Sequence, residues 1–333
     1  MPDLHLISAG SLLEFALERE NFEMPVGRVQ YLFMRPLSFD EFLLAMNEGR
    51  MSVFLSEMEI DSKIGDAVHE KLLRLFKDYL IVGGMPEAVD RHVRRPATAD
   101  FGKTHLSILQ TYRDDFGKYA KRVPFDLLQN IFQTAPSQVG QIYKYSHVDR
   151  NVQSREVKGA LRLLEKAGVV TRILSTSGHG LPFLKDAGEK RFKVVFLDIG
   201  LMQKSCGLEA NIALATDFLQ INAGAVAEQV VGQELLAQQD PHEEPALFYW
   251  SREKRGSQAE VDYLIARGQE IIPIEVKSGK TGSLKSLKIF LQEHPKTPFG
   301  IRFSQHPPSF HDRVLSLPLY AVGQVGRLMR SSA

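Results

Sequence analysis

The sequence predicts the α/β fold class in the broad sense (mixed α+β), in which helices and strands share the core. Residues 67–135 follow the period of amphipathic helices, whereas short strand-like runs alternate with helices from residue 216 onward. The chain has 333 residues, of which 44% are hydrophobic and 24% charged, a composition typical of globular proteins. We expect three units, at residues 1–60, 61–215 and 216–333.

The first unit, residues 1–60, contains few regular elements. The apolar run LHLI at 4–7 predicts a buried strand, and the segment at 11–20 predicts a helix. The run VQYLFM at 29–34 predicts a short strand. No convincing partner for LHLI follows in this unit, so we expect the other strands of that sheet to be missing from this chain.

The second unit, residues 61–215, is predicted to be helical and to end in a winged helix. An apolar stripe that begins at Leu72 ends at the pair Gly83-Gly84. Three helices and a β-hairpin then follow in the order of a winged helix-turn-helix. We place these elements at residues 125–135, 138–146, 151–168, 169–175 and 192–198.

Basic side chains mark the third helix of this predicted winged helix. Arg155, Lys158 and Arg162 fall on one side of the helix, which suits contact with a phosphate backbone. The whole chain has 41 basic and 40 acidic residues, so a nucleic-acid partner has to be recognised by a local patch such as this one. The alternative is an ordinary solvated helix face.

The third unit, residues 216–333, is predicted to be an α/β domain. A helix from Gly224 to Ala237 precedes three strand-like runs, and an amphipathic helix and a further strand come after them. The strand-like runs are ALFYW, QAEVDYLIA and IIPIEVK, followed by the helix SLKSLKIFLQEH and the strand FGIRFS.

Charged residues interrupt two of these apolar strands. Strand alternation places Glu275 and Lys277 on the same face of IIPIEVK, and burial of ionic groups is costly unless they are paired or bind a metal. Asp262 lies in the preceding strand, and a hairpin through the turn ARGQE would bring it beside Glu275. Glu260, on the same face as Asp262, is the alternative acid at this point.

A third acid comes from the preceding helix. Glu228 shares a side of that helix with Gly224, Val231, Gly232 and Leu235, so the glycines leave room beside the carboxylate. We predict that Glu228, Asp262 and Glu275 converge and hold Mg²⁺, which prefers carboxylate oxygens. Lys277 would then stabilise negative charge during phosphodiester hydrolysis. The alternatives are a solvated Glu275–Lys277 pair and a solvent-facing Glu228.

A second basic segment precedes Asp262. Arg252, Lys254 and Arg255 lie in the turn before its strand, where they would hold a backbone phosphate or form a hydrophilic hairpin tip. The single cysteine excludes an internal disulfide, and no apolar run is long enough for a membrane helix. We therefore expect a cytoplasmic protein that has no membrane partner.

The order Glu228, Asp262, Glu275-Val276-Lys277 resembles the PD-(D/E)XK restriction-endonuclease-like superfamily, although the first proline of that motif is absent. A second resemblance spans nearly the whole chain and is to a prokaryotic family of AAA-type ATPases of unknown function, with winged-helix and nuclease-like regions. It is carried by GRVQYLFMRPLSFDEF, YLIVGGMPEAV, ILQTYRDDFGKYAK, FLDIGLM and AEVDYLIA…IIPIEVKSG, and LHLISAGSLLEF is similar to a late strand of the ATPase core.

The P-loop of such ATPases, GxxxxGK[ST], occurs nowhere in this chain. The resemblance therefore implies a remnant of the ATPase core at residues 1–60, and we expect neither ATP binding nor ATPase activity from this chain alone. Three functions stay open: a Mg²⁺-dependent nuclease acting on DNA, a non-catalytic module that binds DNA or protein, and an ATPase subunit. As an ATPase subunit, the chain would place Arg28 as an arginine finger at the nucleotide of a neighbouring subunit, either in a homo-oligomer or in a complex with another chain.

Overall fold

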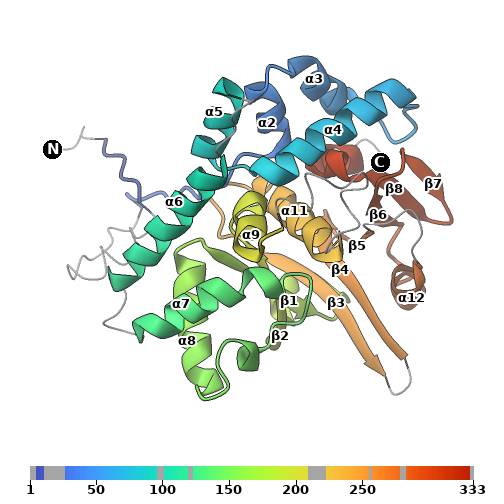
Figure 1. The fold of residues 1–333 in the computed structure, drawn as a ribbon. Coiled ribbons are helices and arrows are strands. Elements are labelled where there is room, and N and C mark those ends of the chain that lie inside the picture. Colours follow the sequence, from blue (N-terminus) through green and yellow to red (C-terminus); the bar gives the residue numbers. More distant parts are fainter. Residues whose placement is uncertain are drawn as a thin grey trace.

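The computed structural model describes residues 5–10, 27–95, 101–118, 123–208, 223–254, 257–277 and 283–330. These residues form helices around an eight-stranded mixed sheet, which confirms the predicted mixed α+β fold (Figure 1). No helix within these ranges is both long and apolar enough to cross a membrane.

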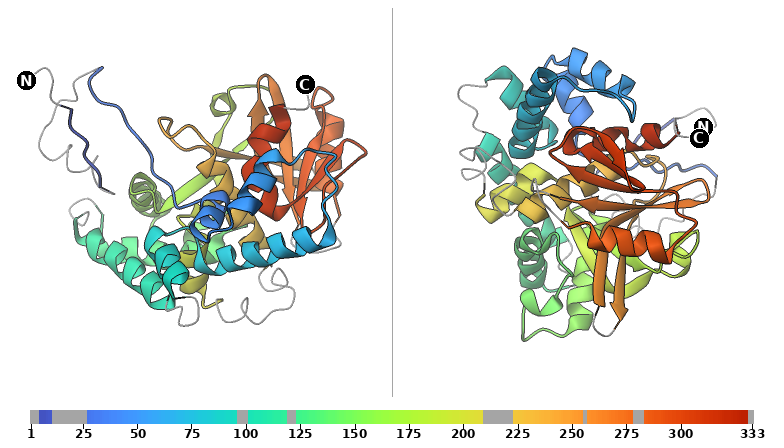
Figure 2. Two further views of the ribbon diagram at one scale, coloured as in Figure 1. Left: turned by 90° about the horizontal axis from the view of Figure 1, so that it is seen from above. Right: turned by 90° about the vertical axis from the view of Figure 1, so that its right-hand side faces the viewer.

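Helices dominate the chain before residue 120 and gather on one side of the sheet (Figure 2). They are α2 (Phe39–Ala45), α3 (Gly49–Glu57), α4 (Asp66–Val82), α5 (Pro86–Arg94), α6 (Phe101–Asp115) and the short 3₁₀ helix η2 (Phe116–Lys118). A capping box starts α2, in which the Glu41 carboxylate accepts from the Ser38 backbone N–H at 2.8 Å. Gly83 ends α4 with a φ of +73°, a conformation that favours glycine.

The central part of the chain has two regular helices before its hairpin instead of three. These are α7 (Phe125–Thr134) and α8 (Ser154–Lys166), and the predicted helix at 138–146 is replaced by 3₁₀ turns η3 (Pro136–Gln138) and η4 (Tyr145–His147). Gly140 has a φ of +74°, and the Tyr143 N–H donates to the Phe192 carbonyl at 2.8 Å. The segment between the two 3₁₀ turns is therefore not helical, and its backbone is hydrogen-bonded to the hairpin at Phe192.

The hairpin belongs to the same sheet as the C-terminal strands. Strand β1 (Val170–Thr176) pairs antiparallel with β2 (Gly188–Phe196) and parallel with β3 (Leu247–Lys254), and the sheet order is β2-β1-β3-β4-β5-β6-β8-β7. The expected boundary at residue 215 therefore separates units that share one sheet. A 3₁₀ turn, η5 (Phe183–Lys185), lies within the hairpin connection, and α9 (Ile199–Cys206) follows it.

Two helices pack against the C-terminal strands through different hydrophobic clusters. The strands β4 (Ser257–Arg267) and β5 (Glu270–Val276) contact α11 (Ala223–Ala237) in a cluster that includes Tyr263. They contact α12 (Lys285–Glu293) in a second cluster that includes Val261. The remaining elements are β6 (Gly300–Ser304), β7 (Ser309–His311), β8 (Val314–Pro318), η6 (Leu319–Gln324) and α13 (Val325–Arg330).

The strands predicted near the N-terminus are not formed within the described residues. Residues 5–10 lie exposed without regular structure, because no strand of the sheet runs beside them, and Ile7 is 96% exposed. Residues 29–34 are also outside the sheet, although the Phe33 N–H donates to the Pro241 carbonyl at 2.7 Å. The helix predicted at 11–20 lies outside the described residues.

Candidate functional site

The β4–β5 hairpin places Asp262 next to Glu275, as the turn spacing predicts. Ladder pairing runs from Arg267–Glu270 to Tyr263–Ile274, so Asp262 and Glu275 occupy the next opposing position. Regular pairing stops there because the Asp262 carboxylate accepts a hydrogen bond of 2.8 Å from the Val276 N–H. Asp262 is thus fixed to the strand that carries Glu275.

Helix α11 brings Glu228 to the same place. Gly232 lets the helix approach β4 closely, since a Cβ at this position would lie 2.6 Å from the Tyr263 hydroxyl. That hydroxyl donates to the Glu228 carbonyl at 2.7 Å and fixes the helix against the strand. The Glu228 side chain is 14% exposed, so it faces inward as the helix pattern predicts.

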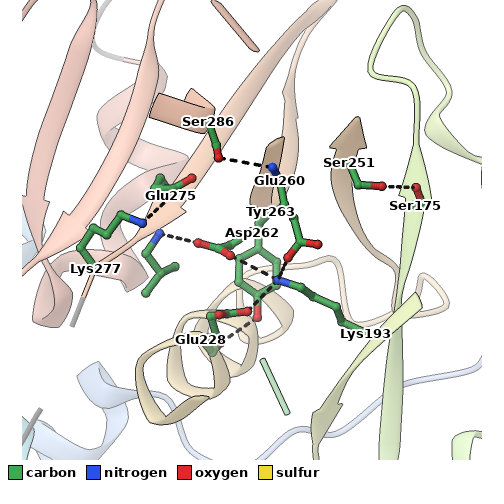
Figure 3. Close-up of polar contacts among 11 residues, drawn as sticks. Ser175, Lys193, Glu228, Ser251, Glu260, Asp262, Tyr263, Glu275, Lys277 and Ser286 are labelled. Atoms are coloured by element: carbon green, nitrogen blue, oxygen red, sulfur yellow. Dashed lines mark hydrogen bonds and ion pairs between the residues drawn. The ribbon is translucent and has the colours of Figure 1, made fainter. Parts of the chain in front are cut away.

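The centre of the cluster is occupied by Lys193 of β2, a residue absent from the predicted site. Its Nζ lies 2.7 Å from Glu260, 2.9 Å from Glu228 and 3.2 Å from Asp262, and its side chain is 1% exposed (Figure 3). The sequence carried a signal for this residue. Lys193 is the one charged residue in the run FKVVFL, where burial requires a charge partner.

Glu275 forms a separate ion pair on the other side of Asp262 (Figure 3). Its Oε1 lies 2.5 Å from the Lys277 Nζ, so the two charged residues of IIPIEVK do meet. Glu275 is only 4% exposed, and its buried Oε2 receives no hydrogen bond from any described residue. Buried polar atoms normally have a partner, so this oxygen is the unsatisfied acceptor of the cluster.

Four acids share two ammonium groups at the cluster. The four carboxylates of Glu228, Glu260, Asp262 and Glu275 face two ammonium groups, those of Lys193 and Lys277, which leaves two negative charges when all six are ionised. Burial first, and then the charge of Asp262, raises the pKa of Glu228 to about 8 and that of Glu275 to about 7. Burial opposes the charge of Lys193, but the surrounding acids raise its pKa well above the ordinary value.

The donor set suits a hard divalent cation, with one obstacle. Carboxylate oxygens are the ligands that Mg²⁺ prefers, and the unpartnered oxygen of Glu275 could accept a cation. However, each Asp262 oxygen already has a partner, Lys193 for one and the Val276 N–H for the other. Among the described residues, no three acids, histidines or cysteines are arranged around a vacant metal position.

The basic residues of α8 are partly engaged with the hairpin. Lys158 lies 2.7 Å from Glu189 of β2, and Arg162 lies 3.2 Å from the same carboxylate. Arg155 is exposed on the first turn of the helix. The predicted basic face therefore exists, but Glu189 neutralises part of it.

Of the other predicted basic residues, the structure describes the side chains of Arg252 and Arg28. Arg252 pairs with Glu293 of α12 at 2.9 Å. Arg255 and the side chain of Lys254 lie outside the described residues. Arg28 is exposed in the turn at Gly27, in the N-terminal segment.

Comparison with known proteins assigns two regions to families of unknown function. Residues 73–211 match a domain of unknown function, DUF8612, and residues 223–321 match another, DUF4143. The second is a domain that often occurs in proteins associated with AAA ATPases. No curated protein and no solved structure matches the chain.

Proposed function

We propose that the chain hydrolyses phosphodiester bonds of nucleic acid at the cluster formed by α11, β4 and β5, with a divalent cation such as Mg²⁺. The observation that carries the proposal is the buried Oε2 of Glu275, which has no hydrogen-bond partner among the described residues and lies in a cluster of four acids. A divalent cation would supply the missing partner of that oxygen and would favour the ionised forms of Glu228 and Glu275.

The positions of the residues suggest two roles, cation binding and stabilisation of negative charge. Asp262 and Glu275 sit opposite each other on the hairpin and would hold the cation, with Glu228 contributing from the helix. A bound cation supplies a polarised phosphate and a water of lowered pKa. Lys277 is partly exposed beside Glu275, so its ammonium can approach a substrate phosphate and stabilise developing negative charge.

The direct test is cleavage of supercoiled plasmid DNA in Mg²⁺ or Mn²⁺. We expect nicking by the unaltered protein and a loss of about 100-fold or more in both Glu275→Gln and Lys277→Met. Glu70→Gln, which changes an exposed acid of α4, is the matched control and should retain activity. Equal nicking by all four proteins would show that the activity comes from another source and would refute the proposal.

The basic face of α8 supports contact with a nucleic-acid backbone, for which we propose DNA, because Arg155 and Arg162 are exposed to solvent. Anisotropy titration of labelled duplex DNA should show weaker binding for Arg155→Ala/Arg162→Ala and a smaller dependence of affinity on salt. The control Arg50→Ala/Arg74→Ala removes two exposed charges elsewhere and should bind as the unaltered protein does. An unchanged salt dependence in the first variant would exclude phosphate contacts at α8.

A non-catalytic binding module is the second candidate, and Lys193 is the observation that favours it. The ammonium of Lys193 already satisfies one oxygen of each of three acids, as expected of a structural counter-ion. The cleavage experiment separates the two functions, since this candidate predicts DNA binding without nicking by any variant.

A relationship to AAA ATPases belongs to the same proposal. DUF4143 supports it, and so do the ATPase-like sequence stretches around Arg28 and Gly83. In this setting the protein would work in the cytoplasm, and exposed Arg28 would reach a nucleotide on a neighbouring subunit. The Arg28→Ala variant should lower ATP hydrolysis by a reconstituted complex, and unchanged hydrolysis would remove Arg28 from this role.

A further inference from the structure

The lysine at the centre of the acidic cluster comes from outside the hairpin and helix that supply the acids. Lys193 lies on β2, within residues 73–211, whereas Glu228, Glu260 and Asp262 lie within residues 223–321. In the described sheet, β2 is an edge strand that pairs only with β1. The two parts of the chain therefore meet at one ammonium group.

All three N–H donors of the Lys193 ammonium have carboxylate partners. An ammonium has three donors, and three carboxylate oxygens lie within 3.2 Å of the Lys193 Nζ. The Nζ also lies 5.7 Å from the centre of the Tyr249 ring, within range of a cation–π attraction. Lys193 is therefore held by its charge partners and by an aromatic face.

The ammonium and a metal ion would compete for the carboxylate oxygens that face Lys193. Mg²⁺ binds oxygens at about 2.0–2.1 Å and repels a neighbouring positive charge, so an ion held by these oxygens of Glu228 and Asp262 would weaken their contact with the Lys193 Nζ. Glu275, whose Oε2 has no donor among the described residues, is the acid that Lys193 leaves open.

We propose that Lys193 is an internal cation that competes with the divalent cation for Glu228 and Asp262 and so sets the metal affinity of the site. The inference rests on the proposed function and adds its regulation. Metal binding and the contacts of the ammonium oppose each other, so a change at β2 that withdraws Lys193 would raise the metal affinity of the site. Lys193 is a positioning residue, because it acts through the acids.

Calorimetric titration of Mn²⁺ tests the competition without relying on cleavage. We expect Lys193→Met to bind Mn²⁺ about tenfold more tightly, or better, than the unaltered protein. The matched control is Lys190→Met, an exposed lysine of the same strand, which should bind as the unaltered protein does. Mn²⁺ should also raise the Tm of Lys193→Met more than that of the control, because the metal replaces the lost ammonium.

The outcomes distinguish failure of the competition from failure of the proposed metal site. Equal Mn²⁺ affinity in Lys193→Met and the unaltered protein would overturn the competition and leave the metal site intact. Absence of Mn²⁺ binding in all of these folded proteins would overturn both. Should Lys193→Met fail to fold, Lys193→Met/Glu260→Gln removes one charge of each sign, and the same affinity criteria apply to it.

Discussion

Helix α11 carries two buried carboxylates that are stabilised in different ways. Glu228, near the start of the helix, shares the Lys193 ammonium with Asp262 and Glu260. Glu234, almost two turns later, is 1% exposed and is held by neutral donors, the Phe39 N–H at 2.9 Å and the Tyr79 hydroxyl at 2.8 Å. One helix therefore combines a charged cluster with a hydrogen-bonded network.

The network around Glu234 joins the helices to one another. Gln233 accepts from the Ile199 N–H at 2.8 Å and thereby ties α11 to α9. Asp198, the N-cap of α9, accepts from the Leu201 N–H and also from the Gly84 N–H at 2.7 Å, just beyond the end of α4. The polar side chains of this network thus fix α4, α9 and α11 in one arrangement.

The difference separates a structural role from a chemical one. Glu234 and Asp198 accept hydrogen bonds from backbone N–H groups, and Glu234 also accepts one from a hydroxyl group. We therefore assign these two acids a structural role. In the Glu228 cluster, by contrast, one buried oxygen of Glu275 has no hydrogen-bond partner among the described residues. A buried acceptor without a partner lowers stability, so we attribute this oxygen to the proposed cation site.

The largest expected effect on stability is at Lys193. Lys193→Met leaves Glu228, Asp262 and Glu260 without their shared cation and should destabilise the fold by roughly 3–5 kcal/mol. Urea unfolding followed by circular dichroism measures this loss. The matched control Lys190→Met should change the unfolding free energy by less than about 0.5 kcal/mol. A loss in Lys193→Met as small as that of the control would show that the acids are not held by this lysine.

The second expected effect is a pH dependence carried by Glu234. Burial raises the pKa of Glu234 in the folded protein to about 7, above its ordinary value of 4.5. Protonated Glu234 therefore stabilises the fold. Its contribution to the free energy of unfolding is fully present below about pH 4.5 and is lost as the pH rises through 7, a change of roughly 3 kcal/mol. Glu234→Gln stays neutral, so its unfolding free energy relative to the unaltered protein should rise by this amount between about pH 4.5 and pH 8.5.

The same urea titrations at the two pH values check the Glu234 prediction. Glu70→Gln serves as the control, since Glu70 is exposed on α4 and its replacement should leave the pH dependence unchanged. A pH dependence that is the same in Glu234→Gln and the unaltered protein would contradict the assignment of a raised pKa to Glu234.

The smallest expected effect is at the tyrosine of the network. Tyr79→Phe removes one hydrogen-bond donor to Glu234, while the Phe39 N–H remains. We expect the free energy of unfolding to fall by about 1–2 kcal/mol. Mn²⁺ affinity should not change, because Tyr79 contacts none of the acids at the proposed metal site. A change in Mn²⁺ affinity, measured by the same calorimetric titration, would show that the Glu234 network and the Glu228 cluster are not independent.

The hairpin acids could be predicted from the sequence because their signals are local. Strand alternation around Glu275 and the turn spacing to Asp262 determine which residues oppose each other, and the structure has this register. The inward side of Glu228 follows in the same way from helix periodicity. The basic face of α8 was also predictable, but its pairing with Glu189 depends on the tertiary fold.

Lys193 was not predicted because its role depends on contacts between distant segments. It lies 35 residues from Glu228 and 69 from Asp262 along the chain, and only the β1–β3 pairing brings its strand into the sheet that carries the acids. The predicted helix at 138–146 was wrong for a similar reason, since the Tyr143 N–H bonds to the hairpin at Phe192. Non-local hydrogen bonds outweigh weak local helix propensity there.

Diffraction from crystals soaked in saturating Mn²⁺ tests the central claim most directly, because anomalous scattering locates the metal. The account predicts an anomalous peak bonded to carboxylate oxygens of Asp262 and Glu275, with the Lys193 ammonium displaced from Asp262. It also predicts that the peak is lost in Glu275→Gln. Well-ordered acids without a peak, and with Lys193 still in contact with Glu228 and Asp262, would contradict the account.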